Sequence, residues 1–346
     1  MSGTIKTVFP GNNSSRGFFS YYESGLAPAE RIYILKGGPG TGKSTLMRRL
    51  AEHFSEEGFD VELWQCSSDN HSLDGVFFPA WKVAVVDGTS PHVVEPRYPG
   101  VREEIVSLGE FWQEDILKGN REEIMALTDD ISAAFREAYR HLAAAGAADE
   151  ALLAARREDS GALAALEGFL GEALGEEPWK VRHFFGAAVT PEGVVDLTLS
   201  LCQSVKRRWF LEGKRGLGQQ LYFEALLARA ERKGLATEVY HGFLDPEEIV
   251  AVIFPEKSLG VAALERVPAE LRREGDHILS FDGAEDGVRE KNAEKQREDA
   301  LAAAVAGIRR AHILHDKLEA YYISAMNFEK IDEIEKKITQ KITKKV

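Results

Sequence analysis

The chain is poor in cysteine and lacks any long apolar run. Its 346 residues include two cysteines, Cys66 and Cys202, which supply neither a disulfide framework nor a metal cluster and suit a reducing compartment. No apolar run approaches the roughly 18 residues of a membrane-spanning helix, and the N-terminus lacks an apolar signal-peptide core. We therefore expect a soluble, cytoplasmic protein with no membrane partner.

Positive charge is also in deficit. The formal net charge is -13 and the pI is near 5.3, which excludes a general binder of nucleic acid or of anionic membranes. The length fits about two domains, each large enough to bury a core of its own.

One complete motif is present. The segment Gly37–Ser44 has the sequence GGPGTGKS and fits G-x-x-x-x-G-K-[ST], the phosphate-binding loop or Walker A motif, at every required position. The apolar run Ile32–Leu35 before it predicts a strand buried on both faces. After it, Leu46, Leu50 and Phe54 recur at helical spacing. A chance glycine-rich turn is the alternative, and the flanking strand and helix argue against it.

The motif predicts binding of ATP and Mg²⁺. Backbone N–H groups at a helix start attract phosphate, and glycines let the main chain approach the phosphate oxygens closely. Lys43 would reach the β- and γ-phosphates as a catalytic charge, and the Ser44 hydroxyl would ligate Mg²⁺. The residues expected to contact the nucleotide are Gly38, Pro39, Gly40, Thr41, Gly42, Lys43, Ser44 and Thr45.

A second metal ligand is expected at the end of a neighbouring strand. Val83–Val86 is apolar and is followed by Asp87, which we interpret as the Walker B carboxylate that holds Mg²⁺ directly or through water. The alternative is a turn aspartate, because Gly88 follows it. His92, a few residues further on, is a candidate sensor of the γ-phosphate, but we favour its interpretation as a surface histidine.

The chain also carries an altered copy of the motif 176 residues later. Gly213–Gln220 keeps the three loop glycines, whereas glutamines replace the lysine and the serine, and Ala263 stands where Asp87 would be. The two regions align without a gap. This pattern predicts a duplicated domain whose second copy has lost its site and acts as a scaffold. Lys214 and Arg215 leave open the binding of some other anion.

We expect an α/β fold with two tandem P-loop NTPase-type domains built on parallel sheets, residues 1–175 and 176–346. Each carries a helical appendage, over residues 113–175 and 288–346, where apolar side chains recur at helical spacing. Gly171–Gly175 marks the linker between them. The last helix, with its apolar stripe of Ile331, Ile334, Ile338 and Ile342, is expected to pack on its own domain rather than on a second chain.

Two aspartates are candidate catalytic groups besides Lys43. The segment after the predicted strand Val61–Gln65 should open near the terminal phosphate, because ligands of open α/β sheets gather at the carboxyl ends of strands. Asp69 is a candidate for orienting water or an acceptor hydroxyl. Its match in the second copy, Asp245, equally favours a structural cap. Asp74 has no acidic match there and is an equal rival.

With these motifs the chain resembles a family of internally duplicated P-loop ATPases found mainly in Gram-positive bacteria. The resemblance implies ATP binding and hydrolysis with Mg²⁺, and it names no physiological substrate. Relatives often keep a fuller second loop, so the two glutamines here are a departure. The matching segments are Gly17–Tyr22, Gly37–Ser44, Cys66–Asp69, Ser72–Val76, Asp87–His92 and His315–Tyr322.

We therefore expect Mg²⁺-dependent ATP hydrolysis in the first domain, with the second structural or regulatory. A small-molecule or nucleotide kinase is the first alternative, because Gly88 stands where many ATPases place a water-orienting glutamate. A non-enzymatic, ATP-dependent switch is the second. A small-molecule acceptor, a protein partner and an oligomeric state all stay open.

Overall fold

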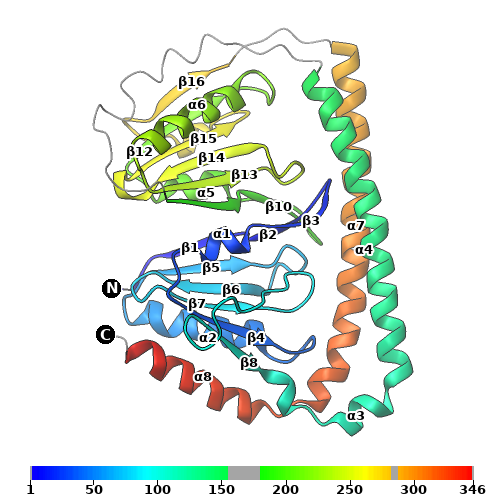
Figure 1. Cartoon of the computed structure of the whole chain (residues 1–346). Helices are drawn as coiled ribbons and strands as arrows, with labels where there is room; N and C mark the ends of the chain where they lie inside the picture. Colours follow the sequence, from blue (N-terminus) through cyan, green and yellow to red (C-terminus); the bar gives the residue numbers. More distant parts are fainter. Residues whose placement is uncertain (1, 155–179, 282–286, 345–346) are drawn as a thin grey trace.

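The computed structural model describes residues 2–154, 180–281 and 287–344. These residues form two six-stranded, mostly parallel sheets with helices packed on them, so the protein is α/β with two similar halves (Figure 1). We call residues 2–154 the first half and residues 180–344 the second half. The predicted linker at Gly171–Gly175 lies outside the described residues.

The first half builds its sheet in the order β1-β5-β6-β7-β4-β8, with a separate β2–β3 hairpin. Its elements are β1 Ile5–Val8, β2 Gly11–Ser14, β3 Gly17–Ser20, α1 Tyr22–Leu26, β4 Arg31–Lys36, α2 Lys43–Glu56, β5 Val61–Gln65, β6 Leu73–Phe78, β7 Val83–Asp87, β8 Glu103–Ser107, the 3₁₀ turn η1 Leu108–Phe111, α3 Glu114–Gly119 and α4 Arg121–Ala154.

The second half repeats this order as β9-β13-β14-β15-β12-β16, with a β10–β11 hairpin. Both sheets even carry a register shift at matching places, after Trp64 in β5 and after Tyr240 in β13. Its elements are β9 Val181–Phe185, β10 Ala187–Thr190, β11 Gly193–Asp196, α5 Thr198–Gln203, β12 Arg207–Glu212, α6 Gln219–Arg232, β13 Thr237–His241, β14 Ile249–Phe254, η3 Pro255–Lys257, β15 Leu259–Leu264, η4 Ala269–Leu271, β16 His277–Ser280, α7 Gly287–Ala325 and α8 Phe328–Thr343.

The sheets are mixed, whereas the sequence predicts parallel ones. Strand β6 pairs antiparallel with β5 and β7, and β14 pairs antiparallel with β13 and β15. The segments 66–72 and 79–82 on either side of β6 are shorter than the dozen or so residues that a parallel crossover needs. The other neighbouring strands, including β4 with β7 and β8, are parallel.

Strand β4 is buried on both faces, as its apolar run predicts. Ile32 and Ile34 face a core shared with the second half, whereas Tyr33 and Leu35 face the core under helix α2. Side chains that alternate between two covered faces leave no polar face, which is why the run is continuously apolar. The strand therefore presents its carboxyl end, and the loop after it, on a rigid base.

The two halves share one apolar core. Helices α1 and α5 lie between the sheets (Figure 1), and a single cluster of buried side chains joins Trp64 and Phe77 of one sheet to Tyr240 and Ile253 of the other. At its edge Phe9 forms an antiparallel bridge with Phe185, its own counterpart in the repeat. A residue that meets its counterpart indicates an approximate twofold relation between the halves.

A buried ion-pair network follows the same symmetry. Lys6 and Arg182 are repeat counterparts, and so are Glu62 and Glu238. Lys6 Nζ lies 2.6 Å from Glu238, and an Arg182 guanidinium nitrogen lies 2.6 Å from Glu62. Burial raises the pKa of the Glu62 carboxyl, but Lys6 and Arg182 reverse this effect and hold the pKa well below its usual range. The network therefore joins the halves by charge as well as by apolar contact.

Two long helices cross between the halves along one side of the molecule (Figure 1). Helix α4 starts beside the first sheet and ends near the second, and α7 runs the opposite way. Alanines line their contact, and a Cβ at Gly307 of α7 would lie 3.0 Å from the Cβ of Ala138 in α4. Small side chains let the two helices approach closely. Helix α4 of the first half and helix α7 of the second half therefore pack together along their length and connect the two halves.

The last helix, α8, packs on the first half. Ile331, Ile338 and Ile342 belong to the same core as Leu46 and Leu50 of α2. The prediction that this stripe packs on its own domain is therefore wrong. The physical reason is the crossing of α7, which carries the chain to the first half before α8 begins.

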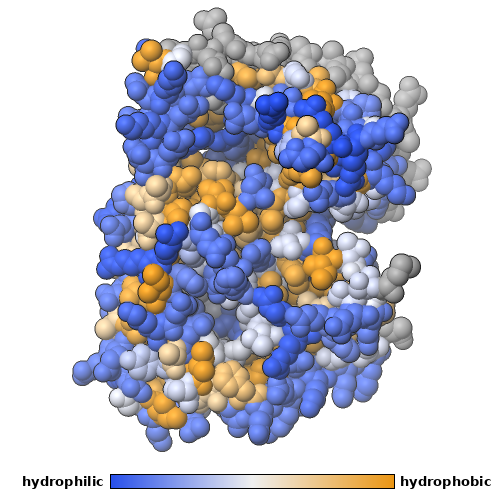
Figure 2. Space-filling view, turned by 180° about the vertical axis from the view of Figure 1, so that it is seen from behind, coloured by the Kyte–Doolittle hydropathy of each residue, from blue (hydrophilic) through white to orange (hydrophobic). Residues whose placement is uncertain are grey.

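The outer surface in Figure 2 is largely hydrophilic, and apolar residues gather on it in smaller patches. Among the helices of the described ranges, none combines the length and the apolar character needed to cross a membrane.

Candidate functional site

The segment Gly37–Ser44, the first loop, joins the end of β4 to the start of α2. Gly40 and Gly42 have φ of +64° and +88°, in the left-handed region where glycine is favoured. The Thr41 hydroxyl donates to the Gly38 carbonyl at 2.8 Å and closes the turn. Pro39 is half-buried at the bend, and Thr45 is exposed on the first turn of α2.

Lys43 folds back into this loop. Its Nζ donates to the carbonyls of Gly37 at 3.1 Å and Gly38 at 2.7 Å, and it lies 3.6 Å from Asp87 Oδ2. The side chain is 10% exposed. A buried ammonium between loop carbonyls and a carboxylate is held where an anion seated on the loop would meet it.

Asp87 lies beside the first loop, and Ser44 is the last residue of that loop, on the first turn of α2. Leu35 pairs with Asp87 across the parallel strands β4 and β7, so the carboxylate ends beside the loop. Asp87 Oδ1 accepts hydrogen bonds from the backbone and hydroxyl of Thr89, which matches the turn alternative, whereas Oδ2 faces Lys43. Ser44 Oγ accepts a hydrogen bond from the Leu73 N–H at 3.0 Å. Hydroxyl and carboxylate oxygens are ligands that suit Mg²⁺.

Both carboxylate oxygens of Asp69 accept hydrogen bonds from residues of its own turn. Oδ1 accepts from the His71 N–H at 2.9 Å, and Oδ2 accepts from the Ser72 hydroxyl at 2.5 Å. Its repeat counterpart Asp245 accepts from the Glu247 N–H in the same way, at 3.0 Å. The local contacts of Asp69 therefore match the structural alternative that the sequence left open.

Asp74, in contrast, is buried in a cluster with His92 and Tyr22. Asp74 Oδ1 lies 3.4 Å from His92 Nε2, and the Tyr22 ring stacks on His92 with 5.5 Å between centroids. Asp74 Oδ2 and His92 Nδ1 have no hydrogen-bond partner within the described part of the chain. Burial raises the pKa of Asp74, and His92 opposes this effect. His92 is 8% exposed, so its interpretation as a surface residue is wrong.

The first loop is covered by helices from the second half. The Gly40 N–H donates to Glu319 Oε1 of α7 at 3.1 Å. A Cβ at Gly38 would lie 2.6 Å from the Tyr322 ring, and one at Gly40 would lie 2.9 Å from the Glu319 carbonyl and from Ile323. Sequence reasoning missed these contacts because the resemblance in His315–Tyr322 says nothing of where that segment packs.

The glutamines of the second loop, Gly213–Gln220, keep the contacts of the residues they replace. Gln219 Nε2 donates to the carbonyls of Gly213 at 3.3 Å and Lys214 at 2.9 Å, which are the counterparts of the two carbonyls that Lys43 meets. Gln220 Oε1 accepts from the Ile249 N–H, as Ser44 does from Leu73. The fold of the loop therefore persists without the ammonium charge and the small hydroxyl.

The second loop is also occupied by acidic side chains. Arg215 meets Asp149 of α4 through two hydrogen bonds of 2.9 and 3.0 Å, and Glu248 through two more. Arg297 of α7 lies 3.2 Å from the same Asp149. The carboxylates of Asp149 and Glu248 therefore pair with Arg215, one of the two residues that the sequence suggested for binding another anion.

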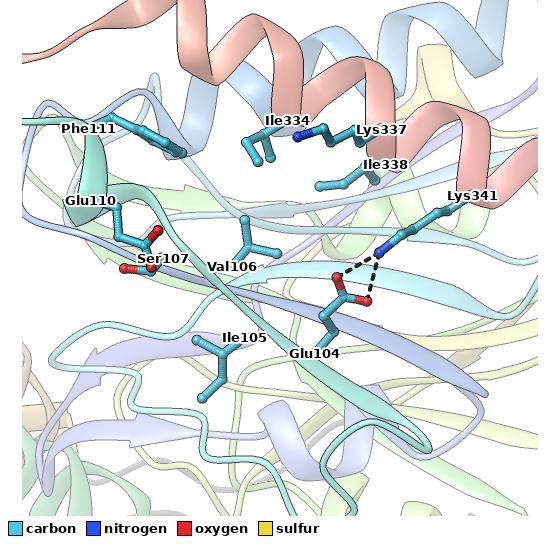
Figure 3. Close-up of a pocket in the computed structure, with 10 residues that line it drawn as sticks. All are labelled: Glu104, Ile105, Val106, Ser107, Glu110, Phe111, Ile334, Lys337, Ile338 and Lys341. Carbon is cyan, nitrogen blue, oxygen red and sulfur yellow. Dashed lines mark hydrogen bonds and ion pairs between the residues drawn. The ribbon is translucent and has the colours of Figure 1, made fainter.

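A separate pocket of about 220 Å³ lies between β8 and α8 (Figure 3). Ile334, Ile338 and Lys341 point from the helix toward the strand, and Lys341 pairs with Glu104. As far as the described residues show, its lining includes no residue of the first loop. The pocket is therefore distinct from the site around Lys43.

Comparison with models of known protein families, with curated proteins and with solved structures finds no match to this chain. Over the described ranges no three His, Cys, Asp or Glu side chains form a group that would hold a metal ion. Mg²⁺ does not need such a group, because it is bound through one or two protein oxygens together with water and phosphate.

Proposed function

We propose that the first half binds ATP through the first loop with Mg²⁺ and hydrolyses it. The contact of Lys43 with Asp87 at the carboxyl ends of β4 and β7, with Ser44 next to Lys43 in the chain, carries this proposal. The loop and Lys43 would hold the phosphates, and Ser44 and Asp87 would hold the metal, which neutralises phosphate charge when bound. Adenine rests on the resemblance to duplicated P-loop ATPases.

Asp74 is the better candidate of the two aspartates for orienting water. Both oxygens of Asp69 are engaged in its turn, whereas the buried Asp74 carboxyl meets, among the described residues, only other side chains, those of His92, Cys66 and Tyr22. Burial raises the pKa of the Asp74 carboxyl, and its contact with His92 gives it a partner for proton transfer. We assign His92 to positioning this carboxyl.

The second half would then be a partner without a nucleotide of its own. Gln219 preserves the loop but carries no charge, and Asp149 and Glu248 already neutralise Arg215. Its crossing helix α7 reaches the first loop, which supports a regulatory role for the second half.

A phosphotransferase acting on a small acceptor is the second candidate. Asp87 ends strand β7, which pairs directly with β4, and it is followed by Gly88. This position therefore lacks the glutamate that orients the attacking water in many ATPases. Phosphate transfer to an added acceptor that exceeds release to water would favour it. Tight binding without turnover would favour a switch.

The decisive experiment compares Mg²⁺-dependent phosphate release by the wild-type protein and Lys43→Gln. The second loop shows that glutamine at this place keeps the carbonyl contacts, so the variant should fold. We expect turnover to fall by about 100-fold or more, since a positioned cation is lost from the developing charge. Gln219→Ala is the matched control and should leave turnover unchanged. Equal turnover of Lys43→Gln and wild type would refute the proposal.

A further inference from the structure

The intact loop is closed by an anion from the other half. Glu319 Oε1 accepts the Gly40 N–H at 3.1 Å, and the Tyr322 ring lies against Gly38. An N–H of this loop is the kind of donor that phosphate oxygens take at a helix start. The Glu319 carboxylate therefore accepts a hydrogen bond that a phosphate would take, and it carries the same sign of charge as that proposed ligand.

Carboxylate and phosphate cannot share that donor. Both are anionic acceptors, and like charges this close repel each other. The backbone of α7 is equally close, because a Cβ at Gly40 would lie 2.9 Å from the Glu319 carbonyl oxygen. A triphosphate on the loop requires the end of α7 to move away.

The two loops differ in how firmly they are covered. At the second loop, Asp149 is 5% exposed and binds Arg215 through two hydrogen bonds. At the first loop, the Glu319 side chain is 35% exposed and is also 3.7 Å from His315 of its own helix. The carboxylate at the second loop, where no ligand is expected, is thus buried. The carboxylate at the first loop, where a ligand is expected, is partly exposed.

We propose that Glu319 and Tyr322 form a latch that holds the first loop closed and that nucleotide displaces. The latch rests on the proposed function of the loop. Displacement moves the end of α7, and because α7 packs along α4 and begins on the second half, loop occupancy changes how the halves are joined. The latch thereby gives the second half control over a site that it does not contain.

The test is calorimetric titration of the full-length protein with Mg²⁺-ATP, comparing wild type with Glu319→Gln. The substitution keeps the size of the side chain and weakens the latch, because a neutral amide oxygen replaces the charged carboxylate as acceptor of the Gly40 N–H. A weaker latch raises the fraction of binding-competent protein, so we expect about tenfold tighter binding. Glu298→Gln removes the same charge from an exposed place on α7, 21 residues (about 30 Å) away, and should bind as wild type does.

Each outcome decides the matter. Equal affinity of Glu319→Gln and wild type overturns the latch and leaves nucleotide binding intact. Weaker binding overturns it too and places Glu319 among the ligand's contacts. If no folded variant binds ATP, the proposed function fails and the latch fails with it.

Hydrogen exchange of the wild-type protein supplies a second measurement that needs no substitution. Amides of residues 316–326 should exchange faster when Mg²⁺-ATP is added, because the end of α7 leaves the loop. Unchanged or slower exchange there, with ATP bound, overturns the proposal.

Discussion

Arg182→Met should strongly destabilise the joint between the halves. The guanidinium lies 2.6 Å from Glu62 and 3.4 Å from Glu238, and both carboxylates are 10% exposed or less. Charges whose centres are about 4 Å apart interact by about 4 kcal/mol at the effective dielectric of protein sites. Lys6 stays 3.4 Å from Glu62 and recovers part of this energy. We expect a loss of about 3 kcal/mol in the free energy of unfolding, within the range for breaking a buried pair.

Urea unfolding at pH 7, followed by tryptophan fluorescence, measures this loss, since the buried Trp64 donates to Glu62 at 2.7 Å. The double variant Glu62→Gln/Arg182→Met removes both charges and should lie within about 1 kcal/mol of wild type. Arg182→Lys is the matched control, because Lys6 already fills the corresponding place in the first half. It should retain most of the stability.

The effect should depend on pH in one direction. The folded-state pKa of Glu62 is lowered, so the stabilisation is fully present above the ordinary value of 4.5 and is lost as the pH falls below it. The difference between wild type and Arg182→Met should therefore shrink in acid. A loss below about 1 kcal/mol at pH 7 would refute the reasoning, because it is the value of a solvated surface pair.

Three further outcomes follow from the structure. Gly307→Leu should lower stability by about 2 kcal/mol in thermal unfolding, because its side chain would be driven into Ala138 of the facing helix; an unchanged midpoint would contradict this packing. Gln219→Lys combined with Gln220→Ser should leave the calorimetric stoichiometry at one nucleotide per chain, because carboxylates already hold the arginine of that loop; a second site would contradict it. Asp74→Asn should abolish most turnover yet raise stability by about 1 kcal/mol at neutral pH, because a carboxyl with a raised folded pKa favours the folded state only in acid. Lower stability at neutral pH would show that the ionised carboxyl is satisfied.

The sequence alone predicts the local features of the first loop and its neighbours. The apolar run before the first loop, the glycines with positive φ and the helical spacing after it are all found where the residues predict them. The fixed offset of the repeat likewise predicts two similar halves, and the two sheets share one strand order. Such features depend on neighbours a few residues apart or on direct comparison of two segments, so the sequence contains them in full.

The sequence does not predict in the same way which distant segments of the chain pack together. The burial of His92, the antiparallel course of β6 and the seating of α8 on the first half all depend on which surfaces meet after folding. The contact of Glu319 with Gly40 joins residues 279 positions apart in the chain, through a helix that crosses from the other half. Amphipathic spacing states that a helix buries one face, but several apolar surfaces compete for that face. The folded packing of the whole chain selects among them, and it is this selection that sets a carboxylate on the intact loop.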